Sequence, residues 1–173
     1  SETVKRLGPL AVLYNCVGTA AANDAPCTEV DMSLWEPTFD RNVLSTFLCC
    51  RHGIPEMIQA GGGSVINMTS WVAARGLWHK HIYTAAKGAV VSLTRALAGA
   101  YSKSGVRVNA IAPGVVKTER SNRQYNNPDW NLAADPSPRA KVRIELMKNY
   151  PFSVGEPEHI AYTALFLASD ESA

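Results

Sequence analysis

Three short apolar runs, each followed by a segment of helix length, constrain the fold of this chain more than any other feature. The runs cover residues 10–14 (LAVLY), 64–68 (SVINM) and 106–111 (VRVNAI). Their length and apolar character are typical of buried strands, and the segments between them show helical spacing. Strands that alternate with helices form βαβ units around a parallel sheet. We therefore expect an α/β fold.

Helix-forming patterns occupy most of the remaining chain. We expect helices at about residues 33–59, 80–102, 139–149 and 157–169. In the first segment, the apolar residues at helical spacing are Phe39, Val43, Phe47 and Leu48. The proline-containing stretch at residues 119–138 is expected to form a long lid.

Composition excludes several classes of function. The 173 residues suffice for one domain with its own core, and a net charge of +2 without a basic block argues against nucleic-acid binding. The four cysteines lack CxxC spacing and the four histidines form no HExxH cluster. We therefore expect no metal site, and reduced thiols in a cytoplasmic protein. No run reaches the ~18 apolar residues that a membrane span needs.

The start of the chain also fits the pattern of a secretory signal peptide. Basic residues precede an apolar run, and small residues follow near Ala20. However, Tyr14 and Asn15 interrupt the apolar run. A buried strand at residues 10–14 explains the same residues, and we favour it.

The run Gly61-Gly62-Gly63 resembles a phosphate-binding loop at first sight. A dinucleotide fingerprint needs a strand before its glycines and a helix after them. Here the expected helix comes before and the strand after, so we interpret the run as a turn. The sequence contains no dinucleotide-binding glycine motif.

Tyr83 stands four residues before Lys87 in the nearly uncharged helix expected at residues 80–102. Residues i and i+4 lie on one helix face, so the two side chains are neighbours. A phenol titrates near ~10 in water, and a fixed ammonium beside it favours the phenolate. Tyr83 is therefore a candidate general acid or base. Alternatively, both residues lie at the edge of a packed helix.

Other motifs accompany this pair. Ser70 follows the strand SVINM, "LYNCVG" (residues 13–18) closes the first strand, and "AIAPGVVKT" (residues 110–118) closes the third. Asn42 lies in "FDRNVLSTF", and "GEPEHIAYTALFLASDES" ends the chain. In this order, the motifs resemble those of the short-chain dehydrogenase/reductase family over nearly the whole chain.

The resemblance implies a Rossmann-like, doubly wound parallel sheet in three layers (α/β/α), and reversible hydride transfer between NAD or NADP and a carbonyl or secondary alcohol. Tyr83 would be the general acid/base, Lys87 would hold the nicotinamide ribose, Ser70 would bind the substrate oxygen, and Asn42 would hold a water linking Lys87 to solvent. The cofactor-binding residues it implies are Asn15, Gly18, Tyr83, Lys87, Pro113, Gly114, Val116 and Thr118. Alternatively, Ser70 caps a loop and Asn42 satisfies helix backbone.

The sequence departs from the family pattern in two ways. Cys16 replaces the second asparagine of an N-N-A-G motif, a change that we expect to be tolerated. The family's first βαβαβ unit, with its glycine-rich turn, and its last strand have no counterpart here. We therefore expect residues 1–173 to form a single but incomplete domain. A catalytically inactive fragment and a non-catalytic binding protein of the same fold are the alternatives.

Aromatic residues near the expected site suggest an apolar, small-molecule substrate. They are Trp71, Trp78 and His79 in the loop after Ser70, and Tyr125 and Trp130 in the expected lid. Alternatively, the tryptophans cover the core.

The helix expected at residues 80–102 carries few charges on either side. We expect its broad apolar arc to cover the sheet; the arc consists of Ala85, Ala89, Val90, Leu93, Ala96, Leu97 and Ala100. The opposite face carries small residues such as Gly88, Val91 and Ser92. A face without charges suits a partner, so we expect a homodimer or homotetramer, as in the family that the chain resembles. Alternatively, this face packs under the chain's own lid or a further segment.

Overall fold

A computed structural model describes residues 2–77, 79–119 and 155–173. The chain divides into two compact units. The first consists of Ser1–Pro113 together with Tyr162–Ala173, and the second of Gly114–Ala161. A single domain over residues 1–173 stays a prediction.

A three-stranded parallel sheet lies at the centre of the first unit. Its strands are β1 (Val12–Asn15), β2 (Gly63–Met68) and β3 (Val106–Ile111), in the order β1-β2-β3. Asn15 pairs with Asn67 and Met68 with Ile111, so the carboxyl ends of all three strands meet at one edge. The three predicted strands are confirmed, with boundaries that differ by no more than two residues.

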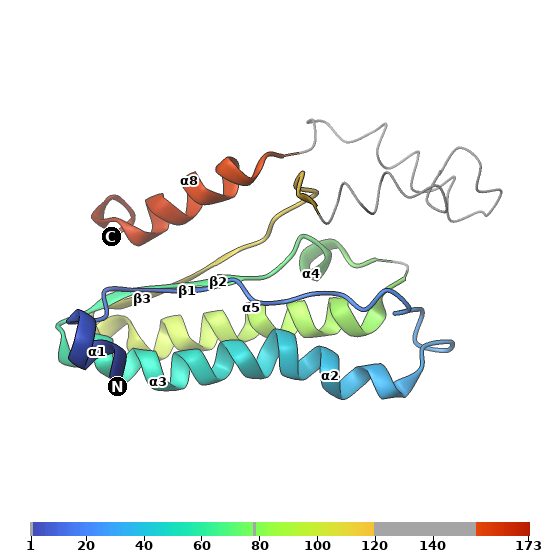
Figure 1. The fold of residues 1–173 in the computed structure, drawn as a ribbon, viewed down its shortest axis with the longest axis horizontal. Helices are drawn as coiled ribbons and strands as arrows, with labels where there is room; N and C mark the ends of the chain where they lie inside the picture. Colours follow the sequence, from blue (N-terminus) through green and yellow to red (C-terminus); the bar gives the residue numbers. More distant parts are fainter. Residues whose placement is uncertain (1, 78, 120–154) are drawn as a thin grey trace. The chain divides into compact units, whose positions relative to one another are not determined.

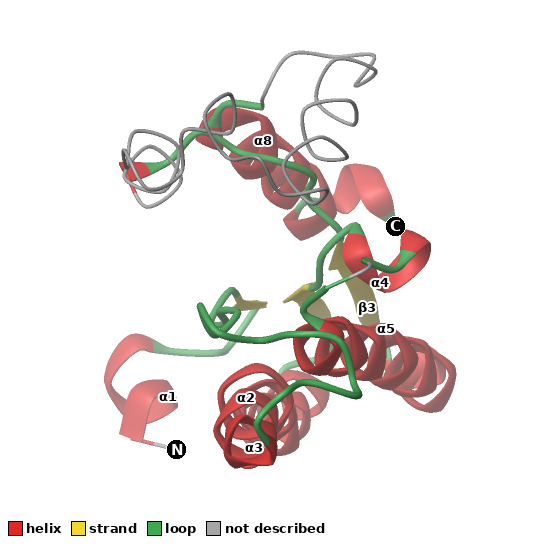
Figure 2. Ribbon diagram, turned by 90° about the vertical axis from the view of Figure 1, so that its right-hand side faces the viewer, coloured by secondary structure: helices red, strands yellow, loops and turns green. Residues whose placement is uncertain are grey.

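Two long helical segments cover one face of this sheet, as Figures 1 and 2 show. The first runs without a break through four elements: the 3-10 helix η1 (Met32–Leu34), α2 (Trp35–Phe39), the π-helix η2 (Asp40–Leu44) and α3 (Ser45–Gln59). The second is α5 (His81–Tyr101), which contacts α2, η2 and β3. Both segments agree with the predicted helices.

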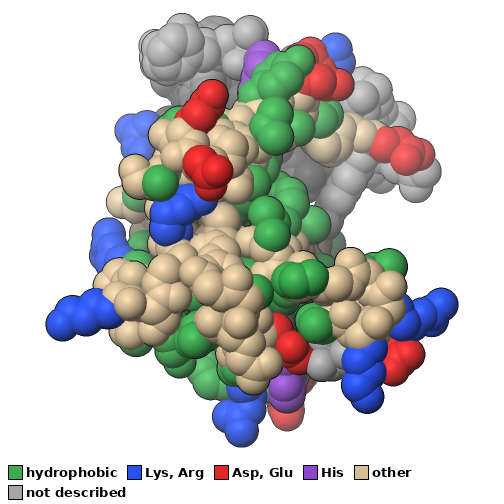
Figure 3. Space-filling model, turned by 90° about the vertical axis from the view of Figure 1, so that its left-hand side faces the viewer, with side chains coloured by type: hydrophobic (Ala, Val, Ile, Leu, Met, Phe, Trp, Pro, Cys, Tyr) green, Lys and Arg blue, Asp and Glu red, His purple; other side chains and the backbone are tan. Residues whose placement is uncertain are grey.

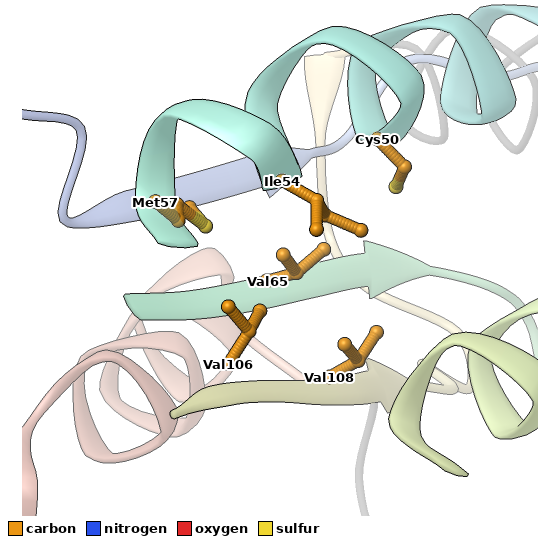
Figure 4. Close-up of a cluster of buried hydrophobic side chains, with 6 residues drawn as sticks. All are labelled: Cys50, Ile54, Met57, Val65, Val106 and Val108. Carbon is orange, nitrogen blue, oxygen red and sulfur yellow. The ribbon is translucent and has the colours of Figure 1, made fainter. Parts of the chain in front are cut away.

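The hydrophobic core fills the space between α3 and the sheet. Cys50, Ile54 and Met57 point from α3 toward Val65 of β2 and the valines of β3, Val106 and Val108 (Figure 4). All six side chains are buried. Val65 and its β3 neighbours alternate with residues that face the other side, as the period of a strand requires.

Helix α8 (Pro157–Ala168) reaches that other side with its carboxyl end. The Ser64 hydroxyl and the Arg107 guanidinium both donate to the carbonyl of Leu167, at 2.7 and 3.0 Å. Arg107 also donates to the carbonyl of Ser169 at 3.0 Å. Cations and donors at a helix carboxyl end satisfy its last carbonyls and complement its dipole. The carboxyl end of α8 therefore contacts the other face at β2 and β3, while Val12 and Tyr14 of β1 stay 39% and 41% exposed.

Short elements complete the described chain. They are α1 (Glu2–Leu7), α4 (Val72–Arg75), and the 3-10 helices η3 (Ser102–Ser104) and η5 (Asp170–Ser172). In the second unit, Val116 and Gly155 form an isolated parallel bridge, with Lys117 N–H donating to the Gly155 carbonyl at 2.8 Å.

The first helical segment is oriented differently from the apolar pattern. Phe47 and Leu48 are 44% and 42% exposed, although their spacing suggested a core face. The buried face carries instead Thr38, Asn42 and Thr46 ahead of the apolar residues of α3. The side chains of Asn42 and Thr46 are accommodated inside because both form hydrogen bonds there, as in the bond from Thr46 Oγ1 to the Asn42 carbonyl.

The predicted apolar arc of α5 is also wrong in part. Its members Ala85, Ala96 and Ala100 are exposed. The buried residues are Ile82, Ala86, Lys87, Val90 and Thr94. The polar members explain the rotation, because Lys87 and Thr94 both hydrogen-bond to β2 and must face it. Alanines contribute little apolar area and do not oppose this rotation.

Several predictions fall on residues 78 and 120–154, outside the described residues. They are the helix at 139–149, nearly all of the lid, and the side chains of Trp78, Tyr125 and Trp130. Within the described ranges, no helix is both long and apolar enough to cross a bilayer. On the face in Figure 3, basic and acidic side chains are scattered rather than gathered into one patch.

Candidate active site

The candidate site lies where β1 and β2 end and the loops after them begin. Asn15 is the last residue of β1 and is 7% exposed, and Gly18 follows in the next loop. Met68 is the last residue of β2, and Ser70 follows it by two positions. Open α/β sheets bind ligands outside the carboxyl ends of their strands, so this edge is the expected place for a site.

Lys87 is buried against the end of β2. Only 3% of the residue is exposed, and its ammonium donates a 2.9 Å hydrogen bond to the carbonyl of Met68. Its own backbone carbonyl accepts a 2.9 Å bond from the Thr69 hydroxyl. These two bonds hold α5 and the end of β2 together on both sides of Lys87.

Tyr83 lies one turn before Lys87 in the first turn of α5. The Lys87 ammonium is 5.8 Å from the centre of the Tyr83 ring. The four-residue spacing therefore brings the two side chains together, as predicted. A cation at this distance interacts favourably with the electrons of an aromatic ring.

Burial depresses the basicity of Lys87. Desolvation lowers the pKa of its ammonium from 10.5 to about 8. A pKa of about 8 still leaves the group mainly protonated at pH 7. The site therefore contains a positive charge with little solvent around it, next to a phenol.

Asn42 is fully buried in the π-helix η2 and fixes the loop after β1. Its side-chain Oδ1 accepts from the backbone N–H of Thr19 at 3.1 Å, and its Nδ2 donates to the carbonyls of Thr19 (2.9 Å) and Thr38 (2.8 Å). The side chain thus satisfies backbone groups. The water-holding role of Asn42 stays a prediction.

Gly18 lies between the polar ends of Asn42 and Lys87. A Cβ atom at this position would come within 2.6 Å of Asn42 Oδ1 and 2.7 Å of Lys87 Nζ. Both distances are shorter than any ordinary contact, so only glycine fits without moving one of the two side chains. The glycine leaves its backbone face open beside Lys87.

A buried polar chain connects the ends of the strands to α5. The Asn15 amide donates to Asn67 Oδ1 at 2.8 Å, and Asn67 Nδ2 donates to the hydroxyl of Thr94 at 3.0 Å. Thr94 in turn donates to the carbonyl of Val90 at 2.8 Å. The Cys50 thiol accepts from Asn15 at 3.4 Å, and burial raises its pKa to about 11. Asn15 therefore holds the sheet together from inside.

The other predicted residues are placed in part. Ser70 is half-buried, and its carbonyl accepts from Ala73 N–H at 3.0 Å as α4 begins. The carbonyl of Pro113 accepts from Trp71 N–H at 3.1 Å, so the segments after β2 and β3 lie side by side. Gly114, Val116 and Thr118 belong to the second unit. Their role in cofactor binding stays a prediction.

Sequence reasoning missed three polar residues that build the site. Thr69 and Asn67 lie in or next to the strand SVINM and position Lys87 and Asn15. Thr19 presents its backbone to Asn42. For Asn67, a polar residue between the apolar residues Ile66 and Met68 was the available signal; the other two roles depend on contacts distant in sequence.

Known proteins with this pattern identify the family. A family profile described as enoyl-(acyl carrier protein) reductase matches residues 1–173. The solved structure of a short-chain type dehydrogenase/reductase from Mycobacterium ulcerans superposes with a TM-score of 0.84 at 29% identity, covering 99% of this chain and 58% of that one. The chain belongs to the short-chain dehydrogenase/reductase family. The predicted resemblance to this family and the predicted Rossmann-like fold are thereby confirmed.

Two curated members of the short-chain dehydrogenase/reductase family illustrate the range of relatives. An "inactive 2-(S)-hydroxypropyl-CoM dehydrogenase 2" from Xanthobacter autotrophicus is 37% identical over 98% of this chain and 70% of its own length. A 2-keto-3-deoxy-L-fuconate dehydrogenase from Xanthomonas campestris is 31% identical over 95% of this chain and 53% of its own. The chain thus spans 70% and 53% of the length of these two relatives.

Proposed function

We propose that the protein containing this chain is an NAD(P)-dependent oxidoreductase. It would transfer a hydride reversibly between the nicotinamide and a carbonyl or secondary alcohol, with Tyr83 as general acid and base. Membership of the family and the dehydrogenase names of relatives support this reaction class. The observation that carries the proposal is the buried ammonium of Lys87, 5.8 Å from the Tyr83 ring.

Burying a cation is costly, and among residues 2–77, 79–119 and 155–173 no carboxylate forms an ion pair with Lys87 to compensate it. Within the described residues, the hydrogen-bond acceptor of the Lys87 ammonium is a neutral carbonyl, that of Met68. Desolvation lowers the pKa of Lys87 to about 8, so the charge is maintained at a cost in stability. A charge that is kept despite this cost indicates a functional role for Lys87 rather than a structural one.

The residues around Lys87 suit a nicotinamide cofactor. An ammonium has three donors, and the bond to Met68 uses one of them, which leaves two for the ribose hydroxyls. Gly18 keeps a space beside Lys87 that any larger residue would fill. From the sequence resemblance we include Asn15, Pro113, Gly114, Val116 and Thr118 in the same role. A bound nicotinamide would give or accept the hydride.

Tyr83 and Lys87 have separate tasks in this mechanism. Tyr83 donates its phenolic proton to the substrate oxygen during reduction and removes it during oxidation. Making a phenol ionise near neutral pH requires about 4 kcal/mol of preferential stabilisation of the phenolate. The ammonium of Lys87 supplies part of it, in a site where little water weakens the field. Ser70 donates a hydrogen bond to the substrate oxygen.

A small-molecule carbonyl or alcohol is the substrate class. Trp71 and His79 lie in the loop between β2 and α5, and both are half-buried. Together with the lid residues they would make the pocket apolar. Asn42 would hold the loop of Gly18 in place and bind the water that returns protons to Lys87.

The test is Tyr83→Phe in the full-length protein, assayed with a panel of secondary alcohols and ketones. The turnover number should fall by about 10²–10⁴-fold, since only the transferable proton is lost. Cofactor affinity should stay within about twofold. Tyr101→Phe, at the opposite end of the same helix, is the matched control and should keep its activity. Retention of most of the wild-type rate by Tyr83→Phe would exclude Tyr83 as the proton donor.

A second candidate is a catalytically silent protein that keeps the fold and binds ligand only. One observation favours it: the 37% identical relative from Xanthobacter is named inactive. Cofactor binding without turnover of any substrate by the wild-type protein, in the same panel, would support this candidate.

We also propose that the protein is a homodimer or homotetramer. Five large apolar side chains of α2, η2 and α3 are 38–45% exposed: Trp35, Leu44, Phe47, Leu48 and Ile58. Exposed apolar side chains are typical of interaction surfaces, and α5 carries few charged residues, Lys87 and Arg95. A second copy, related by a two-fold axis, would cover both helices.

A further inference from the structure

The catalytic helix α5 begins without a cap of its own. Lys80, the residue before its first turn, has φ 62° and ψ 48°, and it is the only non-glycine residue of positive φ in the described chain. Its side chain makes no capping hydrogen bond, and a lysine has no acceptor to offer. The first turn also contains no acidic residue. Something else must satisfy the free N–H groups of this turn.

Asp24 supplies that cap from a distant loop. Its carboxylate accepts from the backbone N–H of Tyr83 through Oδ2 at 2.9 Å and from Ile82 through Oδ1 at 3.3 Å. The residue is only 6% exposed. An aspartate at a helix amino end stabilises the helix through its hydrogen bonds and its charge.

Two residues that follow Asp24 also bind the first turn of α5. The N–H of His81 donates to the carbonyl of Ala25 at 3.3 Å, and His81 Nδ1 accepts from the N–H of Cys27 at 3.0 Å. Residues 24–27 therefore bind the whole first turn of α5, including both neighbours of Ile82. The same loop is held at its other end, where Asn42 binds Thr19.

We infer that Asp24 is a positioning residue for Tyr83, an inference that rests on the proposed function. The carboxylate fixes the backbone of Tyr83 itself, so it determines where the phenol stands relative to Lys87 and the substrate. Misplacement of a reacting group by about 1 Å can cost 10²-fold in rate. Asp24 also makes the loop after β1 a direct link between Asn42 and the catalytic tyrosine.

The first experiment compares Asp24→Ala and Asp24→Asn in the full-length protein with the control Asp31→Ala. Asp31 makes the same kind of cap on the exposed helix η1, where its Oδ1 accepts from the Ser33 N–H at 2.8 Å. Asp24→Ala should lower the turnover number about 10–100-fold, and Asp24→Asn, which keeps one acceptor, should recover part of it. Cofactor affinity and one cofactor site per chain should be retained, and Asp31→Ala should keep its rate.

A double-mutant cycle with Tyr83→Phe separates positioning from general loss of structure. If Asp24 acts through Tyr83, adding Asp24→Ala to Tyr83→Phe should leave the residual rate unchanged within about twofold, because coupled residues are non-additive. The inference would be overturned if Asp24→Ala lowered the turnover number equally in the wild-type and Tyr83→Phe backgrounds. It would also be overturned if Asp24→Ala kept the wild-type rate, or if its loss of rate equalled its loss of cofactor sites per chain. An active Tyr83→Phe would instead count against the proposed function.

Discussion

Lys87 donates its ammonium hydrogen bond to the carbonyl of Met68, 2.9 Å away, at the last residue of the central strand. A neutral oxygen compensates only part of the hydration that the ammonium loses on burial. The fold therefore pulls a charged group out of water and holds it at the point where the strand gives way to the loop of Ser70. This relationship leads to two predictions, one on the pH dependence of stability and one on a substitution next to the ammonium.

Lys87→Met should change how stability depends on pH. The pKa of Lys87 is about 8 in the folded protein and ordinarily 10.5. Between these values the unfolded chain binds more protons, so Lys87 makes the free energy of unfolding rise with pH, and the gain is lost as pH falls through 8. The difference amounts to about 3 kcal/mol across the window.

Urea unfolding of Lys87→Met across this pH range should show that rise abolished. Lys103→Met is the control, since Lys103 lies exposed in η3 and should leave the pH profile as in the wild type. An unchanged rise in Lys87→Met would mean that burial does not depress the basicity of this ammonium.

Gly18→Ala should disturb the site at its narrowest point. The added methyl would lie 2.6 Å from Asn42 Oδ1 and 2.7 Å from Lys87 Nζ, so one of them must move. We expect a loss of about 1–3 kcal/mol in stability and at least tenfold weaker cofactor binding. Gly99→Ala, where a Cβ meets nothing within 4 Å, should keep binding unchanged. Calorimetry of both variants checks this, and wild-type affinity in Gly18→Ala would contradict it.

Thr94→Val should weaken the fold through Asn67. The hydroxyl of Thr94 accepts from Asn67 Nδ2, and valine keeps its shape while leaving that buried donor without its acceptor. A buried unsatisfied donor costs about 1–3 kcal/mol. Thermal unfolding should report this loss, whereas Ser92→Ala on the exposed side of the same helix should be nearly neutral. A neutral Thr94→Val would show that water replaces the hydroxyl.

Gly88→Arg should dissociate the oligomer without unfolding the subunit. A Cβ at Gly88 meets nothing within 4 Å, so a side chain can start there without a clash in the subunit. Across a two-fold interface the same arginine would bring two charges into an apolar contact. Light scattering should show a monomer for this variant and an oligomer for the control Ser104→Arg. A monomeric wild-type protein at micromolar concentration would refute the interface.

The sequence predicted the strands and the Tyr83–Lys87 pair well because both depend on local periodicity. The strand runs are short and apolar, and a four-residue spacing always brings two side chains onto one helix face. The sequence did not predict correctly which face of α5 is buried, because the hydrogen bonds of Thr94 and Lys87 to β2 decide that face. Neither bond has a signature in the helix itself.

Asp24 was likewise invisible in the sequence. Its partners, Ile82 and Tyr83, lie almost sixty residues further along the chain, and only the folded backbone brings them to its carboxylate. A helix that starts with no acidic residue and no capping side chain was the available hint that a cap comes from elsewhere.

The π-helix η2 keeps residues that are spaced four apart on the buried side of the first helical segment. Thr38, Asn42, Thr46 and Cys50 are all buried, at a constant spacing of four residues. In a pure α-helix such a row would drift by about 40° per step, whereas a π turn contains more residues and takes up part of the drift. Deleting one residue of Asp40–Leu44 would restore the α period and turn everything before it by about 100° relative to α3. The Asn42 side chain would then lose its hydrogen bonds to the backbone of Thr19, although the core contacts of α3 would remain. Related chains that are one residue shorter or longer at this point should therefore orient the residue equivalent to Asn42 differently.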